Sequence, residues 1–251
     1  MKPTFSREMG RWFLTDRIRD QVDWRQTLQS QGEAPPPVQK AVAAGAELIR
    51  LPDQADWNIP PCDLLEAIVG RESRRHFVDT ALSREELAFL LWATQGVRRR
   101  LHEAAVLRTV PSAGCRHPFE TYLAVQRVTD LRTGIYRYLP LEHALVLEGS
   151  PEQLAAAVVA AARGQRFCAG AAVTFIWSAI PARTEWRYAE ASAKVISLDA
   201  GHICQNLYLA CEAIGCGTCA IAAYDQDLAD QLVGADGHEE FVVYMSPVGK
   251  R

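Results

Sequence analysis

Helix-like and strand-like segments follow one another in an irregular order along this chain, and that order restricts its fold more than any other feature. Strand patterns rich in β-branched and aromatic residues cover residues 121–128, 134–138, 144–147, 171–180, 217–222 and 241–248. Helical periodicity covers residues 63–69, 83–96, 152–162, 184–214 and 225–233. A doubly wound parallel sheet would need a regular strand–helix–strand rhythm, which is missing. The order therefore predicts an α+β fold.

The clearest helix start lies at residue 83. Ser83 and Glu86 have the spacing of a capping box, and Leu82 and Leu87 flank it as a hydrophobic staple. Gly96 is a natural end for this helix, because glycine readily adopts the left-handed conformation that closes many helices. These signals predict a helix over 83–96.

The longest helical pattern covers residues 184–214. We expect it to be broken or bent near Pro181 and at Gly201, since proline and glycine both weaken a helix. Its second half carries one apolar stripe, which consists of Ile203, Leu207, Ala210, Cys211 and Ile214. Such a stripe predicts a helix that packs along its length.

The first 59 residues read differently from the rest. Residues 7–25 mix charged and aromatic side chains, and residues 29–37 (QSQGEAPPP) form a polar, proline-rich stretch in which a helix cannot persist. We predict an N-terminal extension with a proline-rich linker over 1–59, lying over the main domain or its partner, and a main domain over 60–251. A globule of this size buries about 70–75% of its surface on folding, so it needs neither disulfides nor a metal for stability.

Charge and cysteine content exclude several classes of protein. The formal net charge of −3 argues against a surface devoted to nucleic acid. The longest apolar run, about ten residues around 171–180, is half a membrane span, and no apolar signal region follows the first residues. Seven cysteines, an odd number, suit reduced thiols. We therefore expect a cytoplasmic protein without a nucleic-acid or membrane partner.

The segment after the first helix of the main domain is a candidate anion site. Of the 27 basic residues, 23 are arginine, and Arg71, Ser73 and Arg75 alternate so that an extended segment would project all three to one side. Two guanidiniums and a hydroxyl that converge on one point suit a phosphate. The alternative is a solvated basic loop.

A second candidate is the turn around Pro111, Ser112, Ala113 and Gly114, where proline and glycine give a rigid turn whose backbone can approach a ligand. The alternative is a plain tight turn. His202, on the long helix, is a candidate acid, base or ligand, but a histidine on a largely apolar helix is more often a satisfied core residue.

The cysteines near the end of the long helix have a suggestive spacing. Cys211, Cys216 and Cys219 match the C-x₄-C-x₂-C spacing of an iron–sulfur loop, but no fourth cysteine follows. A zinc site with Cys204 and His202 has the right composition but poor spacing. We therefore predict small buried thiols and no metal.

Six motifs in order carry a family resemblance. They are R-x-S-x-R-x-F at 71–77, the leucine-rich L-s-x-x-E-L pattern at 82–96, R-x-x-P-S-A-G-x-x-x-P-x-E at 108–120, D-x-G-H-x-x-Q-N-L-x-L-x-A at 199–210, G-x-G at 215–217 and P-V-G-K at 247–250. Over residues 33–251 the chain resembles the nitroreductase-like flavoproteins, and within them the SagB-type dehydrogenase branch. Each motif is weak alone, and their order makes the match specific.

The resemblance implies an architecture and a cofactor. It implies a central, mainly antiparallel sheet flanked by helices and an intertwined homodimer, with one FMN per subunit at the dimer interface. The helix around Ile203–Ile214 would be the interface helix.

The resemblance also gives the segments roles. Arg71 and Ser73 would lie near the phosphate and ribityl groups, Arg75 would face the pyrimidine edge, and the turn would lie along the isoalloxazine. The backbone at Ala222 and Ala223 would approach N5. Lys250 and Arg251 would replace the basic phosphate contacts that other members carry beyond P-V-G-K.

The implied function is an FMN-dependent oxidoreductase that transfers hydride through flavin N5 in a ping-pong cycle. NAD(P)H is an expected transient reductant, and the substrate is a small molecule or a peptide of unknown identity.

The chain departs from the branch at two places. Azoline-oxidising members carry a Lys-Tyr pair where this chain has Arg187 and Tyr188. Arginine cannot act as a base near neutral pH, which leaves Tyr188 as the catalytic candidate. The A-L-Y that usually follows P-S-A-G is Cys115-Arg116-His117 here, a more basic mouth. These departures motivate the alternative of a non-catalytic flavin-binding scaffold in a modification complex.

Overall fold

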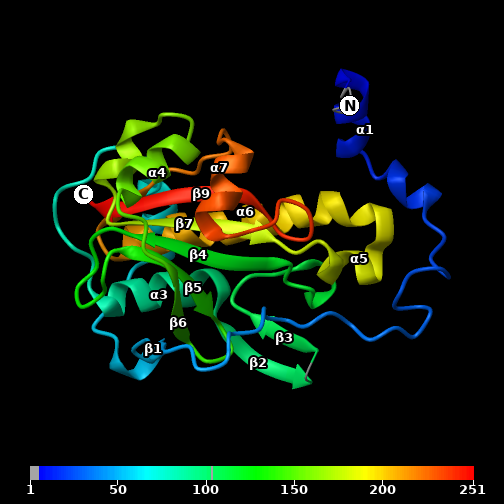
Figure 1. Cartoon of the computed structure of the whole chain (residues 1–251), viewed down its shortest axis with the longest axis horizontal. Coiled ribbons are helices and arrows are strands. Elements are labelled where there is room, and N and C mark those ends of the chain that lie inside the picture. The colour runs from blue at the N-terminus through cyan, green and yellow to red at the C-terminus, as the bar shows by residue number, and fades with distance from the viewer. Residues whose placement is uncertain (1–5, 103) are drawn as a thin grey trace.

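A seven-stranded sheet forms the centre of the molecule (Figure 1). The computed structural model describes residues 6–102 and 104–251. The strand order is β1-β6-β5-β4-β7-β9-β8, and every neighbouring pair is antiparallel. The strands are β1 (Leu48–Arg50), β4 (Phe119–Val125), β5 (Gly134–Leu139), β6 (Ala144–Gly149), β7 (Val173–Ala179), β8 (Cys216–Thr218) and β9 (Phe241–Lys250). The predicted α+β fold with a central antiparallel sheet is confirmed.

Alternation along the strands builds a core on each face of this sheet. In β4, Phe119 and Leu123 join one buried cluster, while Tyr122 and Ala124 join the other, as expected when successive side chains point to opposite faces. Helices α3 (Arg84–Gln95) and α6 (Ser192–Ala213) cover the first face. Helices α4 (Leu154–Ala161) and α7 (Gln226–Val233) cover the second (Figure 1).

The start of α3 follows the predicted capping box. Ser83 Oγ accepts from the backbone N–H of Glu86, at 3.1 Å, and the Glu86 carboxylate accepts from the backbone N–H of Ser83, at 2.9 Å. Gly96 follows the last residue of the helix, but its φ of −58° and ψ of 138° are not the left-handed conformation expected of a glycine cap. The helix therefore begins and ends where local sequence signals place it.

Substitution of Ser83 by alanine is expected to lower the free energy of unfolding by about 1 kcal/mol, because one N-terminal N–H loses its acceptor. Urea titration followed by circular dichroism measures the change. Ser197, whose exposed hydroxyl bonds only the carbonyl of Ala193 within its own helix, supplies the control Ser197→Ala. Equal losses in the two variants would contradict the capping role.

The long helical pattern is interrupted at a different place from the one expected. Helix α5 (Ala182–Tyr188) begins directly after Pro181, but the second break falls at Ala189, whose φ is +44°, and not at Gly201. Gly201 lies inside the uninterrupted 22-residue helix α6. Nothing lies within 4 Å of the space that a Gly201 side chain would occupy. Gly201 therefore does not break the helix, and no close contact within the described part of the chain requires a glycine there.

The strand predicted for 217–222 is also shorter than expected. Strand β8 ends at Thr218, because the backbone N–H of Ala220 donates to the hydroxyl of Tyr208 instead of to a strand. Pairing resumes only as an isolated bridge between Ile221 and Met245. A hairpin of β2 (Val97–His102) and β3 (Ala105–Arg108), which was not predicted, forms a separate small sheet.

The N-terminal segment runs across the body and contributes to it. Strand β1 lies within residues 1–59 and pairs with β6 at the edge of the sheet. Before β1 in the sequence, the backbone N–H of Lys40 donates to Glu120 at 2.8 Å, and the Lys40 ammonium donates to Glu240 at 2.6 Å. Arg108 and Arg137 donate to the carbonyls of Val38, Lys40 and Ala41. Residues 38–41 are therefore fixed to the core by side chains that come from distant strands.

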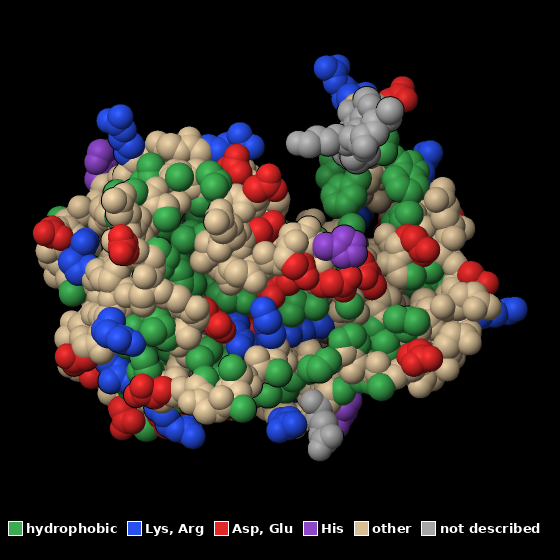
Figure 2. Space-filling view, in the orientation of Figure 1, with side chains coloured by type: hydrophobic (Ala, Val, Ile, Leu, Met, Phe, Trp, Pro, Cys, Tyr) green, Lys and Arg blue, Asp and Glu red, His purple; other side chains and the backbone are tan. Residues whose placement is uncertain are grey.

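Helix α1 (Arg7–Leu14) projects from the body near α5 (Figure 1). None of its residues is buried, and it exposes Met9, Trp12, Phe13 and Leu14. Figure 2 shows hydrophobic side chains on the projecting arm. Elsewhere, α2 (Leu64–Gly70) begins at its N-cap Asp63. No helix in the described part of the chain is both long and apolar enough to span a membrane.

Candidate functional site

Residues 71–75 form an extended segment, which we call the strap, along β8. Ser73 forms a bridge with Thr218, and the backbone N–H of Arg74 donates to the Thr218 carbonyl at 2.9 Å. The Arg74 side chain turns inward over Gly217, where a Cβ would lie 2.7 Å from its Cδ, and pairs with Glu72 at 2.5 Å. The Arg74 side chain therefore packs and pairs within the fold, whereas Arg71, Ser73 and Arg75 can contact a ligand.

Arg71, Ser73 and Arg75 lie over aromatic side chains. The Arg71 guanidinium is 5.5 Å from the centre of the Tyr208 ring, and Ser73 Oγ is 2.9 Å from the Tyr208 hydroxyl. Arg75 is 5.9 Å from the ring of Phe167. Neither arginine has a carboxylate within 4.0 Å among residues 6–102 and 104–251. Two cations with only π partners are suited to bind an anion from solution.

The stretch after β8 lies beside the strap. Tyr208 joins the two, since its hydroxyl contacts Ser73 and accepts from the backbone N–H of Ala220 at 2.8 Å. Ala222 and Ala223 are exposed, and the Ala223 carbonyl accepts from Gln165 at 3.1 Å. The structure therefore places the strap beside Ala220, two residues before Ala222. A cofactor contact from Ala222 or Ala223 stays a prediction. Sequence reasoning missed Tyr208, whose only signal was an aromatic residue on a polar edge of the helix.

The predicted turn at 111–114 is held by α6. Ser112 donates to Asp199 at 2.5 Å, the Ala113 N–H also donates to Asp199, and Ser112 Oγ accepts from the His117 N–H. Gly114, Cys115 and His117 all have positive φ values. Burial raises the pKa of Asp199, while the bonds from Ser112 and Ala113 oppose that shift. Hydrogen bonds to Asp199 thus hold the turn in place, and the positive φ values indicate backbone strain, which is typical of functional sites.

Tyr188 and His202 lie near this turn. A Cβ on Gly114 would lie 2.9 Å from the Tyr188 hydroxyl, so the two are in contact. The His202 side chain is 49% exposed, and its Nδ1 is 4.0 Å from Asp199 Oδ1. The interpretation of His202 as a core residue is therefore wrong, because it lies on the outward face of α6.

The predicted cofactor residues form two groups within one chain. The strap and Ala222–Ala223 lie near Tyr208, and the turn and Tyr188 lie near Asp199. Asp199 and Tyr208 are separated by nine residues of one helix, about 14 Å along its axis. The two groups therefore lie at different positions along α6 within one chain.

Lys250 and Arg251 are already paired with carboxylates. Lys250 donates to Glu86 and to the Ile214 carbonyl, and Arg251 donates to Glu212 at 2.5 Å. Both pairs lie at the end of β9, next to Gly215, whose carbonyl accepts from the Arg251 N–H. A phosphate contact from either residue stays a prediction.

The seven cysteines are all free thiols. Burial raises the pKa of Cys204 and Cys216 to about 12 and raises that of Cys211 well above its ordinary value. Metals bind the thiolate form, which these pKa values disfavour. In the described ranges no three His, Cys, Asp or Glu side chains form a group that could hold a metal ion.

Sequence comparison decides the family. A model described as the nitroreductase family matches residues 68–250. The chain belongs to the nitroreductase family. It is also 30% identical to "Putative nitroreductase MJ1384" of Methanocaldococcus jannaschii over 204 residues, which cover 81% of this chain and 96% of that protein. It is therefore a nitroreductase-family oxidoreductase.

Solved structures show the same fold. The nitroreductase-family chain is similar to a Ralstonia eutropha crystal structure described as a putative nitroreductase, with a TM-score of 0.66, 24% identity and coverage of 86% of this chain and 94% of that one. It is also similar to a chain of the Escherichia coli microcin synthetase McbBCD complex, with a TM-score of 0.60, 17% identity and coverage of 100% and 99%. At these identities the likeness concerns the fold alone.

Proposed function

We propose that this nitroreductase-family protein is an FMN-dependent oxidoreductase of the SagB-type branch. The observation that carries the proposal is the strap, where Arg71 and Arg75 lack carboxylate partners among the described residues while Arg74 between them is paired. When bound, FMN would supply hydride transfer at N5 in a ping-pong cycle. Arg71 and Ser73 would hold the phosphate and ribityl groups, and a positive charge at Arg75 would stabilise negative charge on the pyrimidine edge.

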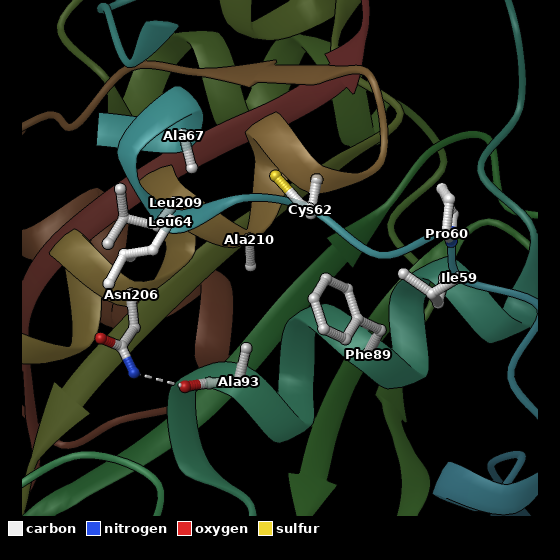
Figure 3. Close-up of a pocket in the computed structure, with 11 residues that line it drawn as sticks. Ile59, Pro60, Cys62, Leu64, Ala67, Phe89, Ala93, Asn206, Leu209 and Ala210 are labelled. Carbon is white, nitrogen blue, oxygen red and sulfur yellow. Dashed lines mark hydrogen bonds between the residues drawn. The ribbon is translucent and has the colours of Figure 1, made fainter. Parts of the chain in front are cut away.

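The two separate groups of predicted site residues support a homodimer. Helix α2 exposes Leu64, Leu65, Ile68 and Val69, a large apolar surface for a monomer. Beside it, a groove of about 380 Å³ lies between α2, α3 and α6 (Figure 3). The figure shows Phe89, Leu209 and Ala210 on its walls, with Asn206 bonded to the Ala93 carbonyl at 2.8 Å. We infer that a second copy covers this face.

A two-fold axis across α6 would complete the cofactor site. It would run the two copies of α6, including the predicted interface segment Ile203–Ile214, in opposite directions. The Asp199 end of one helix would then lie beside the Tyr208 end of the other. The turn at 111–114 from one copy and the strap from its partner could thereby contact the same flavin.

The proposed substrates follow from the branch and from the similar structures. NAD(P)H is the proposed reductant, in line with a Staphylococcus epidermidis structure of similar fold described as a putative NAD(P)H:FMN oxidoreductase, with a TM-score of 0.55 and 13% identity. The microcin synthetase complex is described with a truncated pro-MccB17 bound, which keeps peptides beside small molecules as substrates. Tyr188, at the turn, is the proposed proton donor or acceptor.

A non-catalytic scaffold is the second candidate function, because Arg187 stands where azoline-oxidising members carry lysine. Protein that holds stoichiometric FMN, yet is never reduced by NAD(P)H or by candidate substrates, would favour the scaffold. Rapid turnover would exclude it.

Arg71→Gln is expected to weaken FMN binding by about 10- to 100-fold, because a charge-assisted phosphate bond contributes about 1.5–3 kcal/mol. Flavin fluorescence titration of FMN-free protein measures the dissociation constant. The control Arg74→Gln removes an equal charge from the strap but is expected to change affinity less than about threefold. Wild-type protein that is colourless as purified and takes up no FMN would overturn the proposed function.

A further inference from the structure

We propose that Arg187 and Arg19, together with Tyr188, form a subsite for a carboxylate group of the substrate. This inference rests on the proposed function, because it assigns the substrate class of the same site. It goes beyond that function by selecting carboxylate-bearing molecules over neutral ones.

The two guanidiniums share one aromatic ring. Arg187 lies 5.8 Å from the centre of the Tyr188 ring, and Arg19 lies 5.9 Å from it and 5.3 Å from the ring of Trp24. A planar guanidinium held over an aromatic ring can still donate bidentate bonds to a carboxylate through the N–H groups at its edge. Arg19 Nε already donates to Asp16 at 3.1 Å, so the other N–H groups of Arg19 would serve the substrate. The cluster therefore combines Arg19 and Trp24 of the N-terminal segment with Arg187 and Tyr188 of α5.

This cluster is pressed against the turn predicted to lie along the flavin. A Cβ on Gly114 would lie 2.8 Å from Arg187 Cδ, 2.9 Å from the Tyr188 hydroxyl and 3.1 Å from Arg187 Nε. Gly114 also has a φ of +57°, which other residues rarely adopt. The glycine therefore lets both side chains approach the turn closely, and a bound carboxylate would lie next to the reacting groups.

One of the two arginines of the subsite, Arg187, has no matching acid among the described residues. Arg187 has no carboxylate within 4.0 Å in the described part of the chain, whereas Arg19 is paired with Asp16 at 3.1 Å. Behind the turn, Arg116 is 4% exposed, and its Nη2 has no hydrogen-bond partner. Burial lowers the pKa of Arg116, and the charges of Arg187 and Arg183 lower it further. The positive charges of Arg187 at the surface and of buried Arg116 behind it would attract a negatively charged carboxylate to this place.

Backbone strain gathers around the same cluster. Cys115, His117 and Ala189 have φ values of 55°, 46° and 44°, and they are three of six non-glycine residues with positive φ in the described ranges. Two lie directly after the turn at 111–114, and the third follows Tyr188. Strain of this kind costs about 1–3 kcal/mol per residue and persists where the surroundings fix a functional geometry.

The test compares 4-nitrobenzoate with its neutral analogue, 4-nitrobenzamide. Calorimetric titration of FMN-free protein gives binding, and steady-state reduction by FMN-loaded protein gives kcat/KM. Wild-type protein is expected to favour the carboxylate by about tenfold in both. Arg187→Gln should abolish the preference for the carboxylate over the amide, and Arg187→Lys should retain part of it. The control Arg132→Gln removes an exposed arginine at the far end of β4 and should keep the preference.

The outcomes separate the subsite from the proposed function. Equal binding of acid and amide by wild-type protein that still reduces the amide would overturn the subsite and leave the oxidoreductase in place. A carboxylate preference that depends on Arg187 in FMN-free protein, without any flavin uptake, would keep the subsite and reject the proposed function. A preference that survives Arg187→Gln would assign the charge recognition elsewhere and overturn the inference.

Discussion

Glu120→Gln is expected to lower the free energy of unfolding by about 3–5 kcal/mol, the usual cost of removing one partner of a buried ion pair. Glu120 is 3% exposed and accepts from Arg183 at 2.5 Å and from the Lys40 N–H at 2.8 Å. Arg137 lies 3.7 Å from its other oxygen. Glutamine keeps the volume but leaves two buried guanidiniums without their shared countercharge.

Urea titration followed by tryptophan fluorescence measures this loss. The control Asp79→Asn makes the same chemical change in an exposed pair, with Arg127 at 3.1 Å, and should alter stability by less than about 1 kcal/mol. If the two variants differ by less than 1 kcal/mol, Glu120 is not the countercharge of the buried arginines.

Acidification is expected to destabilise the protein through His117. Burial is the largest cause that lowers the His117 pKa, with Arg108 next, and together with other nearby arginines they bring it to about 3. The ordinary value is 6.5, so between about pH 6.5 and 3 the unfolded chain binds a proton that the folded chain does not. Stability therefore falls as the pH falls through this window, with a slope of up to about 1.4 kcal/mol per pH unit.

Unfolding free energies measured at several pH values from 7 to 4 test this slope. His117→Asn removes the titrating group, and asparagine tolerates the φ of +46° at this position. The variant should therefore lose less stability on acidification than wild type does. His238→Asn, at an exposed histidine, should follow the wild-type slope. Parallel slopes for wild type and His117→Asn would show that His117 does not stay neutral in the fold.

Local signals in the sequence predicted local structure well. The capping box at Ser83 and Glu86 needs only four residues, and both of its bonds form. The inward-facing and outward-facing residues of β4 follow from alternation alone. Helix bending was harder to predict, because the break at Ala189 depends on how the chain packs there and not on an intrinsically weak residue such as Gly201.

Long-range partners could not be predicted from spacing. Asp199 belongs to a motif, but its bonds to Ser112 and Ala113 cross more than 80 residues. Tyr208 joins the strap to Ala220 only after three separate segments have met. The sequence also could not reveal that the predicted cofactor residues form two groups, one near Asp199 and one near Tyr208 of α6. That separation depends on how distant segments pack in space.

The attachment of residues 38–41 sets an order for folding. Lys40 is bound to Glu240, 200 positions along the chain, and to Glu120, 80 positions along. Contacts this distant in sequence close large loops, which is slow and entropically costly. During synthesis, residue 40 leaves the ribosome early. Its partner Glu240, which directly precedes β9, is made only 200 residues later. The segment can contact Arg108, Glu120 and Arg137 earlier, but its full set of bonds forms only after Glu240 has been made.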